Sequence, residues 1–176
     1  TIIAVTADNG TPKEIVSLFN GTLFQGGKGS TKEAGVHVPL FITWPNYIAP
    51  GTVNGNLVDF PDFMSTFAEM TATDISSFGQ TDGVSFYRQL TNELYTPRSY
   101  SYDYYHPLTN KGNTTLRPWI QDSVYKLYHL SGNFFNIKED PLELKKIKQG
   151  VMNTEQKASF NRFKSLLNTY PSVATP

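Results

Sequence analysis

The chain has 176 residues, of which 39% are hydrophobic and 14% aromatic, enough to build a folded core. This composition excludes a mainly disordered protein. Basic and acidic residues balance at 15 each, which excludes a general nucleic-acid binder because such a protein needs a basic surplus. No apolar run reaches the roughly 20 residues of a membrane span. The absence of cysteine excludes disulfides, thiolate zinc sites and cysteine nucleophiles within these residues.

The first half of the chain predicts an α/β unit. The apolar runs Thr1–Thr6 and Val38–Trp44 are typical of buried parallel strands, and the segment between them is long enough for a crossover. Asp59 can cap a helix whose apolar stripe consists of Phe60, Phe63, Met64 and Phe67. A second short helix is expected around residues 85–90. Because the chain begins within a strand-like run, we expect it to be a piece of a longer protein.

After about residue 95 the pattern changes to closely spaced strands. Serine and tyrosine alternate between residues 97 and 105, and further strand candidates follow at 116–121, 124–130 and 133–137. Such spacing favours an antiparallel meander. Thr154 then caps a final helix with an apolar face formed by Phe160, Phe163, Leu166 and Leu167. We therefore predict two domains, residues 1–95 and residues 96–176.

Two polar loops in the first half are candidates for chemistry. Asp8 and Asn9 directly follow the first strand, where ligands bind in open parallel sheets, and their oxygens suit calcium or magnesium. An Asp-Asn-Gly sequence is also common as a plain turn. Lys28 lies among three glycines, a setting in which backbone amides and a lysine hold an anion. A flexible surface loop with a solvated lysine explains the same residues.

Two histidines are weaker candidates. His37 precedes the second buried strand and could contact a ligand or be a satisfied, half-buried histidine. His106, beside Tyr104 and Tyr105, could lie at the mouth of a carbohydrate-sized cleft, although core packing also explains the tyrosines.

Several short motifs follow one another in a fixed order along the chain. The first half carries Asp8-Asn9-Gly10, then Gly27-Lys28-Gly29, then Glu-Ala-Gly-Val-His-Val-Pro at residues 33–39, before a strand that ends in Trp44-Pro45. This series resembles the formylglycine-dependent sulfatases, which typically show Asp-Asn-Gly, a Gly-Lys-Gly-Thr-like loop and Glu-Gly-Gly-x-Arg-Val-Pro in that order. The order of the motifs is far more specific than any one of them.

The likeness continues downstream. Residues 58–61 (Val-Asp-Phe-Pro) and 82–85 (Asp-Gly-Val-Ser) are similar to the family's Val-Asp-x-x-Pro-Thr and Asp-Gly-x-Ser motifs. Tyr125-Lys126-Leu127 and residues 135–143, which contain Asp140-Pro141-Leu142-Glu143, are similar to its terminal Tyr-Lys-Leu and Asp-Pro-x-Glu signatures. The resemblance therefore covers nearly the whole chain.

The resemblance implies an α/β fold of the alkaline-phosphatase-like kind, incomplete here. Residues 1–95 would be the C-terminal part of the catalytic domain on a mixed sheet. Residues 96–176 would be a small α+β subdomain with a four-stranded antiparallel sheet and a C-terminal helix. It also implies calcium-assisted hydrolysis of sulfate monoesters, with Asp8 and Asn9 as metal ligands and Lys28 as the sulfate contact. His37 and His106 are the candidate substrate-binding residues.

The chain departs from the family pattern in ways that matter for activity. Ala34 replaces a usual glycine, and His37 stands where arginine is usual. The nucleophile of the family, a formylglycine made from Cys or Ser in a Cys/Ser-x-Pro-Ser-Arg motif, precedes the Asp-Asn-Gly motif and is not found in these residues. Two further metal-binding aspartates are also absent. We therefore expect this chain alone to be inactive and to need the missing N-terminal portion to complete its sheet and its site.

Two other functions remain open. One is a phosphate or phosphonate ester hydrolase of the same superfamily, and the other is a non-catalytic binding module. Two-metal relatives typically carry Asp-His-Gly at the first turn, so Asn9 favours one calcium ion and sulfate. The expected partner is a sulfated small molecule or carbohydrate, with no nucleic acid and no membrane span. The resemblance also implies a periplasmic or secreted protein.

Overall fold

The computed structural model describes residues 1–19, 21–106 and 116–170, and its contacts divide the chain into two compact units. Unit 1 comprises Thr1–Val5 and Leu40–Ser101, and unit 2 comprises Thr6–Pro39 and Tyr102–Pro176. This division differs from the predicted boundary near residue 95, because residues 6–39 pack with the C-terminal half of the chain. The assignment of residues 1–95 to a catalytic domain remains a prediction.

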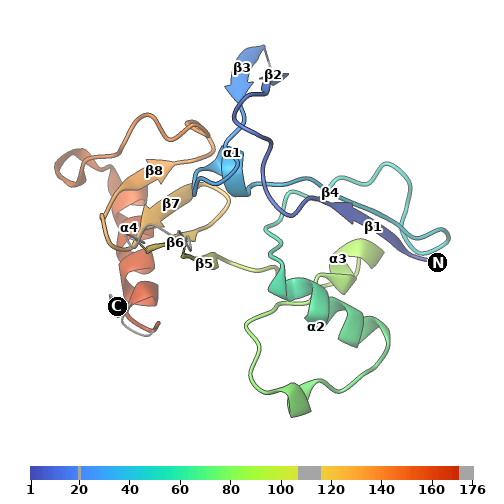
Figure 1. Ribbon diagram of the computed structural model, residues 1–176. Helices are drawn as coiled ribbons and strands as arrows, with labels where there is room; N and C mark the ends of the chain where they lie inside the picture. Colours follow the sequence, from blue (N-terminus) through green and yellow to red (C-terminus); the bar gives the residue numbers. More distant parts are fainter. Residues whose placement is uncertain (20, 107–115, 171–176) are drawn as a thin grey trace. The chain divides into compact units, whose positions relative to one another are not determined.

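Unit 1 contains a two-stranded sheet at the predicted positions (Figure 1). β1 (Ile3–Thr6) lies beside β4 (Leu40–Thr43). All four residues of β1 are exposed, with Ile3 at 54% and Val5 at 55%. A strand this apolar is typical of a sheet interior. The described residues do not supply the cover that such a strand needs.

The helices of unit 1 are α2 (Pro61–Met70), the 3-10 turn η1 (Ser76–Phe78) and α3 (Tyr87–Thr91), close to the predicted positions. The predicted apolar stripe of α2, however, does not form its buried face. Met64 and Phe67 are each 45% exposed, whereas Asp62 and Thr66 are buried. The exposed stripe is a second apolar surface that this unit leaves uncovered.

Arg98 explains why α2 buries a carboxylate. Its guanidinium pairs with Asp62, which also accepts hydrogen bonds from the backbone N–H groups of Asp59 (2.8 Å) and Val84 (2.7 Å). The prediction that Asp59 caps the helix was wrong. The residue at the cap position is Phe60, and the Asp59 carboxylate accepts a hydrogen bond from the Phe60 N–H. The first turn of the helix is held by Asp62 instead.

Unit 2 contains the predicted meander, a four-stranded sheet in the order β5-β6-β7-β8. Its strands are β5 (Ser101–Tyr105), β6 (Arg117–Gln121), β7 (Tyr125–Tyr128) and β8 (Phe134–Asn136), and β7 pairs antiparallel with both β6 and β8. The N-terminal part of this unit adds a hairpin of β2 (Val16–Phe19) and β3 (Thr22–Gln25), followed by the short helix α1 (Glu33–Val36). The hairpin was not predicted, because its residues were interpreted as a crossover.

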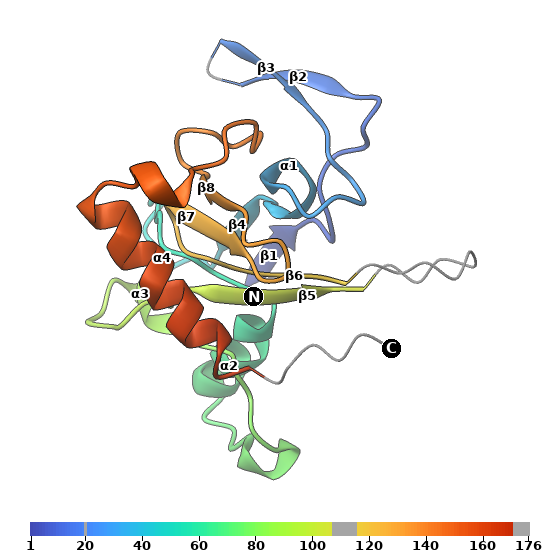
Figure 2. The same ribbon diagram turned by 90° about the vertical axis from the view of Figure 1, so that its left-hand side faces the viewer.

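The last helix, α4 (Thr154–Leu167), follows the 3-10 turn η2 (Gln149–Val151) and packs across the sheet of unit 2 (Figure 2). The Phe134 ring packs edge-on against Phe160 and Phe163, at centroid distances of 5.4 and 6.4 Å. The helix cap is Asn153, which forms a reciprocal capping box with Gln156, one residue before the predicted cap. None of the described helices is both long and apolar enough to cross a membrane.

Candidate functional site

Backbone hydrogen bonds bring the two candidate polar loops of unit 2 together. The N–H of Gly10 donates to the carbonyl of Gly35 over 2.8 Å, and the N–H of Lys28 donates to the carbonyl of Thr11 over 3.0 Å. The Asp-Asn-Gly turn, the Lys28 loop (residues 25–30) and α1 therefore form one backbone cluster, which we call the loop cluster. The sequence motifs that suggested chemistry thus meet in space.

Glycine is required in the loop cluster because three backbone segments touch. A Cβ atom at Gly10 would lie 2.0 Å from the Ala34 carbonyl oxygen, and one at Gly35 would lie 2.3 Å from the Ser30 carbonyl oxygen. Neither approach is sterically possible for a residue with a side chain. The glycines at these two positions therefore serve close packing rather than a loose surface loop.

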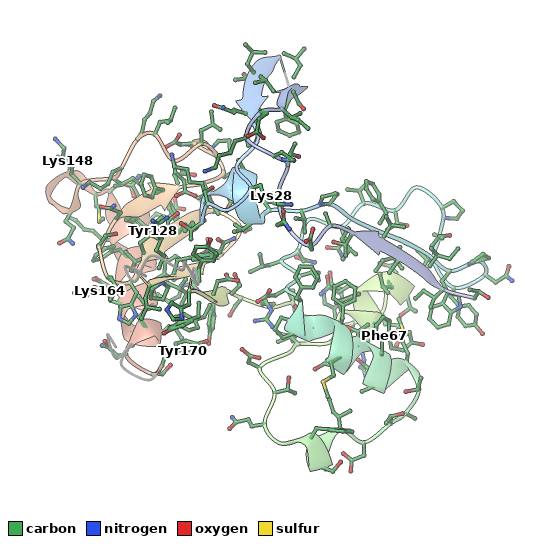
Figure 3. All side chains as sticks on the ribbon, viewed as in Figure 1. Lys28, Phe67, Tyr128, Lys148, Lys164 and Tyr170 are labelled. Carbon is green, nitrogen blue, oxygen red and sulfur yellow. The ribbon has the colours of Figure 1, made fainter. Side chains whose placement is uncertain are left out.

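The side chains that the loop cluster presents are accessible. Asp8 and Lys28 are exposed and Asn9 is half-buried. Figure 3 shows Lys28 on the loop next to α1. A carboxylate, an amide oxygen and an ammonium group are thus available to a ligand within one small region of unit 2.

The side-chain oxygens of the loop cluster are of the kind that calcium binds, but they are fewer than a calcium ion needs. Asp8 and Asn9 offer hard oxygen ligands, whereas calcium takes six to eight oxygens. The part of the chain that the structure describes contains no group of three or more His, Cys, Asp or Glu residues placed to hold a metal. A calcium ion held by Asp8 and Asn9 would therefore need further oxygen ligands in addition to these two side chains.

His37 is tied to α1 by an ion pair. Its Nδ1 lies 3.1 Å from Oε2 of Glu33, one helical turn earlier, while its side chain stays 76% exposed. The hydrogen bond to Glu33 raises the pKa of His37 above 6.5, although partial burial opposes the shift. Burial acts to raise the pKa of Glu33, but the bond to His37 and the charge of Lys126 outweigh it and lower that pKa.

His106 is not joined to the loop cluster by any contact of the described residues. It directly follows β5 and is exposed. The prediction that it binds substrate is untested.

A buried ionic cluster, which sequence reasoning missed, attaches the sheet of unit 2 to the segment beside the Lys28 loop. Lys126 on β7 is fully buried, and its Nζ lies 3.0 Å from Oε1 of Glu143 and 3.5 Å from Oε1 of Glu33. The ammonium also donates to the carbonyl of Thr31 and lies 4.9 Å from the ring centroid of Trp119. We call the group of Lys126, Glu33, Glu143 and Tyr128 the Lys126 cluster.

Tyr128 completes this cluster. Its hydroxyl donates to Oε2 of Glu143 over 2.6 Å and lies 3.1 Å from the carbonyl oxygen of Thr31. Burial and the neighbouring Glu143 carboxylate raise the pKa of the Tyr128 phenol above its ordinary value of 10, so it remains a hydrogen-bond donor at neutral pH. The buried carboxylate is thus satisfied on both oxygens.

The alternation of polar and apolar residues along β7 explains why sequence reasoning missed the Lys126 cluster. A lysine between the apolar residues Tyr125 and Leu127 predicts a solvent-facing position on a strand with one buried face. Both faces of β7 are in fact covered, one by α4 and the other by the segment around Thr31 and Glu33. The available signal was that Lys126 and Glu143 belong to the two C-terminal motifs of the sulfatase resemblance.

The comparisons with known proteins point to one class, the sulfatases. A sulfatase candidate from Bacteroides thetaiotaomicron VPI-5482 superposes with a TM-score of 0.71 at 19% identity, covering 96% of this chain and 35% of that chain. A structure solved in complex with its substrate, D-glucosamine-2-N,6-O-disulfate, superposes with a TM-score of 0.67 at 20% identity, covering 99% and 36%. The fold is therefore the alkaline-phosphatase-like fold of sulfatases, of which this chain has the C-terminal part.

The sequence comparisons name the family. The model of the N-sulphoglucosamine sulphohydrolase C-terminal family matches residues 27–169, and the chain belongs to that family. Steryl-sulfatase of Mus musculus is 31% identical over 90 residues, which is 47% of this chain and 14% of the relative. The chain thus spans about a seventh of that relative and about a third of the solved structures.

Proposed function

We propose that this chain is the C-terminal part of a sulfatase that hydrolyses sulfate monoesters of carbohydrates. The observation that carries the proposal is the loop cluster, in which backbone bonds of Gly10 and Lys28 join the Asp8-Asn9 turn to the Lys28 loop and α1, in a chain of sulfatase fold and family. A sulfated sugar is the bound substrate of one structural relative, which supports carbohydrate as the substrate class.

The residues of the loop cluster have separate roles in this proposal. Asp8 and Asn9 would hold a calcium ion, which when bound supplies positive charge that stabilises negative sulfuryl oxygens. Lys28 would contact a sulfuryl oxygen as a mobile point charge, and its place is set by the hydrogen bond between its own N–H and Thr11. The nucleophile would be a formylglycine in another part of the protein.

The proposal includes a longer parent protein. The exposed apolar surfaces of β1 and of the α2 stripe support it, because surfaces of this kind are normally covered. The share of each relative that the chain covers supports it as well. The periplasmic or secreted compartment proposed with it is supported by the family resemblance alone.

Substitution of Lys28 tests the proposal in the full-length protein. We expect Lys28→Ala to lower kcat on a chromogenic aryl sulfate by about 10²- to 10³-fold, the usual cost of losing one group that stabilises transition-state charge. Bound calcium, measured by atomic emission, should be unchanged. Lys13→Ala is the control, since Lys13 is an exposed lysine of the same unit and its loss changes the net charge equally.

Two results would contradict the assignment of Lys28. One is equal turnover by Lys28→Ala and Lys13→Ala, and the other is loss of calcium from Lys28→Ala. An aryl phosphate assayed in parallel separates the two kinds of hydrolase. Faster hydrolysis of the phosphate than of the sulfate would favour the phosphate or phosphonate ester hydrolase instead.

A further inference from the structure

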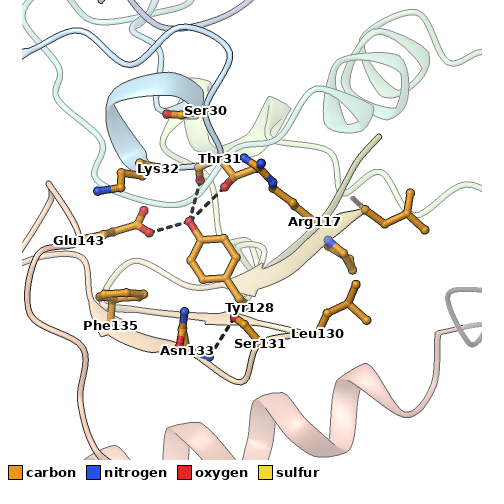
Figure 4. Close-up of a pocket in the computed structure, with 12 residues that line it drawn as sticks. Ser30, Thr31, Lys32, Arg117, Tyr128, Leu130, Ser131, Asn133, Phe135 and Glu143 are labelled. Atoms are coloured by element: carbon orange, nitrogen blue, oxygen red, sulfur yellow. Dashed lines mark hydrogen bonds between the residues drawn. The ribbon is translucent and has the colours of Figure 1, made fainter. Parts of the chain in front are cut away.

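A pocket of about 400 Å³ lies in unit 2, between the residues that follow Lys28 and the sheet (Figure 4). Thr31 and Lys32 line it from the N-terminal segment, and Arg117, Tyr128 and Asn133 from the sheet and its turns. Lys28, Asp8 and Asn9 are not among its lining residues. The pocket is therefore built from groups that the proposed sulfatase mechanism leaves unused.

The charges around the pocket favour an anion. Arg117 lies beside Tyr128 in the close-up of Figure 4 and is exposed. Lys32 also lines the pocket, and its ammonium donates to the carbonyl of Leu142 over 3.0 Å. The Glu143 carboxylate, which also lines the pocket, is compensated by the buried Lys126 ammonium at 3.0 Å. The cations at the pocket consequently have no uncompensated carboxylate among the described lining residues to oppose an anionic ligand.

The uncharged lining suits a sugar ring. Leu116, Pro118, Leu130 and Phe135 offer apolar surface, while the polar groups are hydroxyls and one amide. Ser30 also lines the pocket, but its hydroxyl is buried against Gly35 and does not face the pocket. A mainly apolar wall with a few polar groups is the usual make-up of a small-molecule site.

We propose that this pocket binds a sugar ring that carries an anionic group, as a site additional to the loop cluster. The choice of a sulfated sugar as the ligand rests on the proposed function. The existence of an anion-binding pocket rests only on the lining residues. In this arrangement Arg117 bonds the anionic group, Asn133 bonds a ring hydroxyl, and Phe135 packs on the ring.

Isothermal titration calorimetry on the full-length protein tests this site without any turnover. The probe is N-acetylglucosamine 6-sulfate, titrated into the Lys28→Ala variant so that the proposed sulfate contact is absent. Adding the Arg117→Ala substitution to the Lys28→Ala variant should weaken binding of the sulfated sugar by at least about tenfold, because one charge-assisted hydrogen bond contributes about 1.5–3 kcal/mol. Asn133→Asp should also weaken it, because it adds a negative charge to the pocket that holds the anionic ligand. Lys148→Ala, which removes an exposed lysine outside the pocket, should leave the affinity within twofold.

The outcomes separate this proposal from the proposed function. Complete loss of binding in Lys28→Ala alone would overturn the pocket, since the sugar would then bind only at the loop cluster. Equal affinities in the Arg117→Ala, Asn133→Asp and Lys148→Ala variants would overturn it too, as would equally tight binding of neutral N-acetylglucosamine. A failure of the proposed function appears instead as absent turnover on aryl sulfate, which this binding measurement does not use.

Discussion

Lys126 is the single side chain on which unit 2 depends most clearly. Its ammonium is fully buried and serves two carboxylates and a backbone carbonyl. A buried ion pair is weak evidence for net stability, but removal of one partner leaves an uncompensated buried charge. Lys126 therefore matters mainly because its loss would leave a buried carboxylate without its cation.

We expect Lys126→Met to lower the free energy of unfolding by about 3–5 kcal/mol, because the buried Glu143 carboxylate would lose its cation and Glu33 would keep only His37. Urea denaturation followed by circular dichroism measures the change. Lys148→Met is the control, and an exposed substitution of this kind should stay within about 0.5 kcal/mol of the native protein. A loss below about 1 kcal/mol in Lys126→Met would show that the pair is not held as the structure has it.

At the scale of residues, sequence reasoning found part of the candidate site. Asp8, Asn9 and Lys28 were recognisable because they lie in ordered motifs, and backbone bonds of Gly10 and Lys28 join the two loops that carry them. The Lys126 cluster was not recognisable from periodicity, since its four side chains come from three separate segments of the chain. Local pattern does not report contacts between segments so distant in sequence.

At the scale of elements, α1 is a four-residue helix whose ends are joined by the Glu33–His37 pair. We expect the pKa of His37 in the folded protein to lie above 6.5, and Glu33→Gln to lower it. A histidine NMR titration measures both values. A His37 pKa at or below 6.5 in the native protein would contradict the pair.

The sign of the accompanying stability effect follows from the raised pKa of His37. The stabilisation by protonated His37 is fully present below the unfolded value of about 6.5 and is lost as the pH rises through the higher folded value. The difference in unfolding free energy between the native protein and His37→Asn should therefore shrink with rising pH. The effect should be small, because the His37 side chain is largely exposed.

The elements themselves were predicted unevenly. The meander and α4 followed from strand alternation and from the apolar face of Phe160 and Phe163, and both formed as predicted. The hairpin of β2 and β3 was missed because most of its residues are exposed, so that no buried face marked it. The apolar stripe of α2 was predicted from its spacing, and the described part of the chain leaves Phe60, Met64 and Phe67 exposed.

At the scale of the whole molecule, the chain consists of two units that differ in how completely they bury their apolar residues. Unit 2 buries an aromatic core between its sheet and α4 and pairs the buried Lys126 ammonium with Glu143. Unit 1 leaves the apolar residues of β1 and α2 exposed. This contrast explains why the four-stranded sheet of unit 2 could be predicted from local alternation. The surface that covers the apolar strand β1 could not be predicted in this way.

The measurement that tests the account most directly is the calcium content and turnover of Asp8→Ala in the full-length protein, with Asp74→Ala as the control at an exposed aspartate of unit 1. Atomic emission after dialysis gives the calcium content, and an aryl sulfate assay with and without added calcium gives the turnover. The account predicts that Asp8→Ala loses both bound calcium and calcium-dependent turnover, while Asp74→Ala keeps both. Full calcium occupancy and unchanged turnover in Asp8→Ala would contradict it.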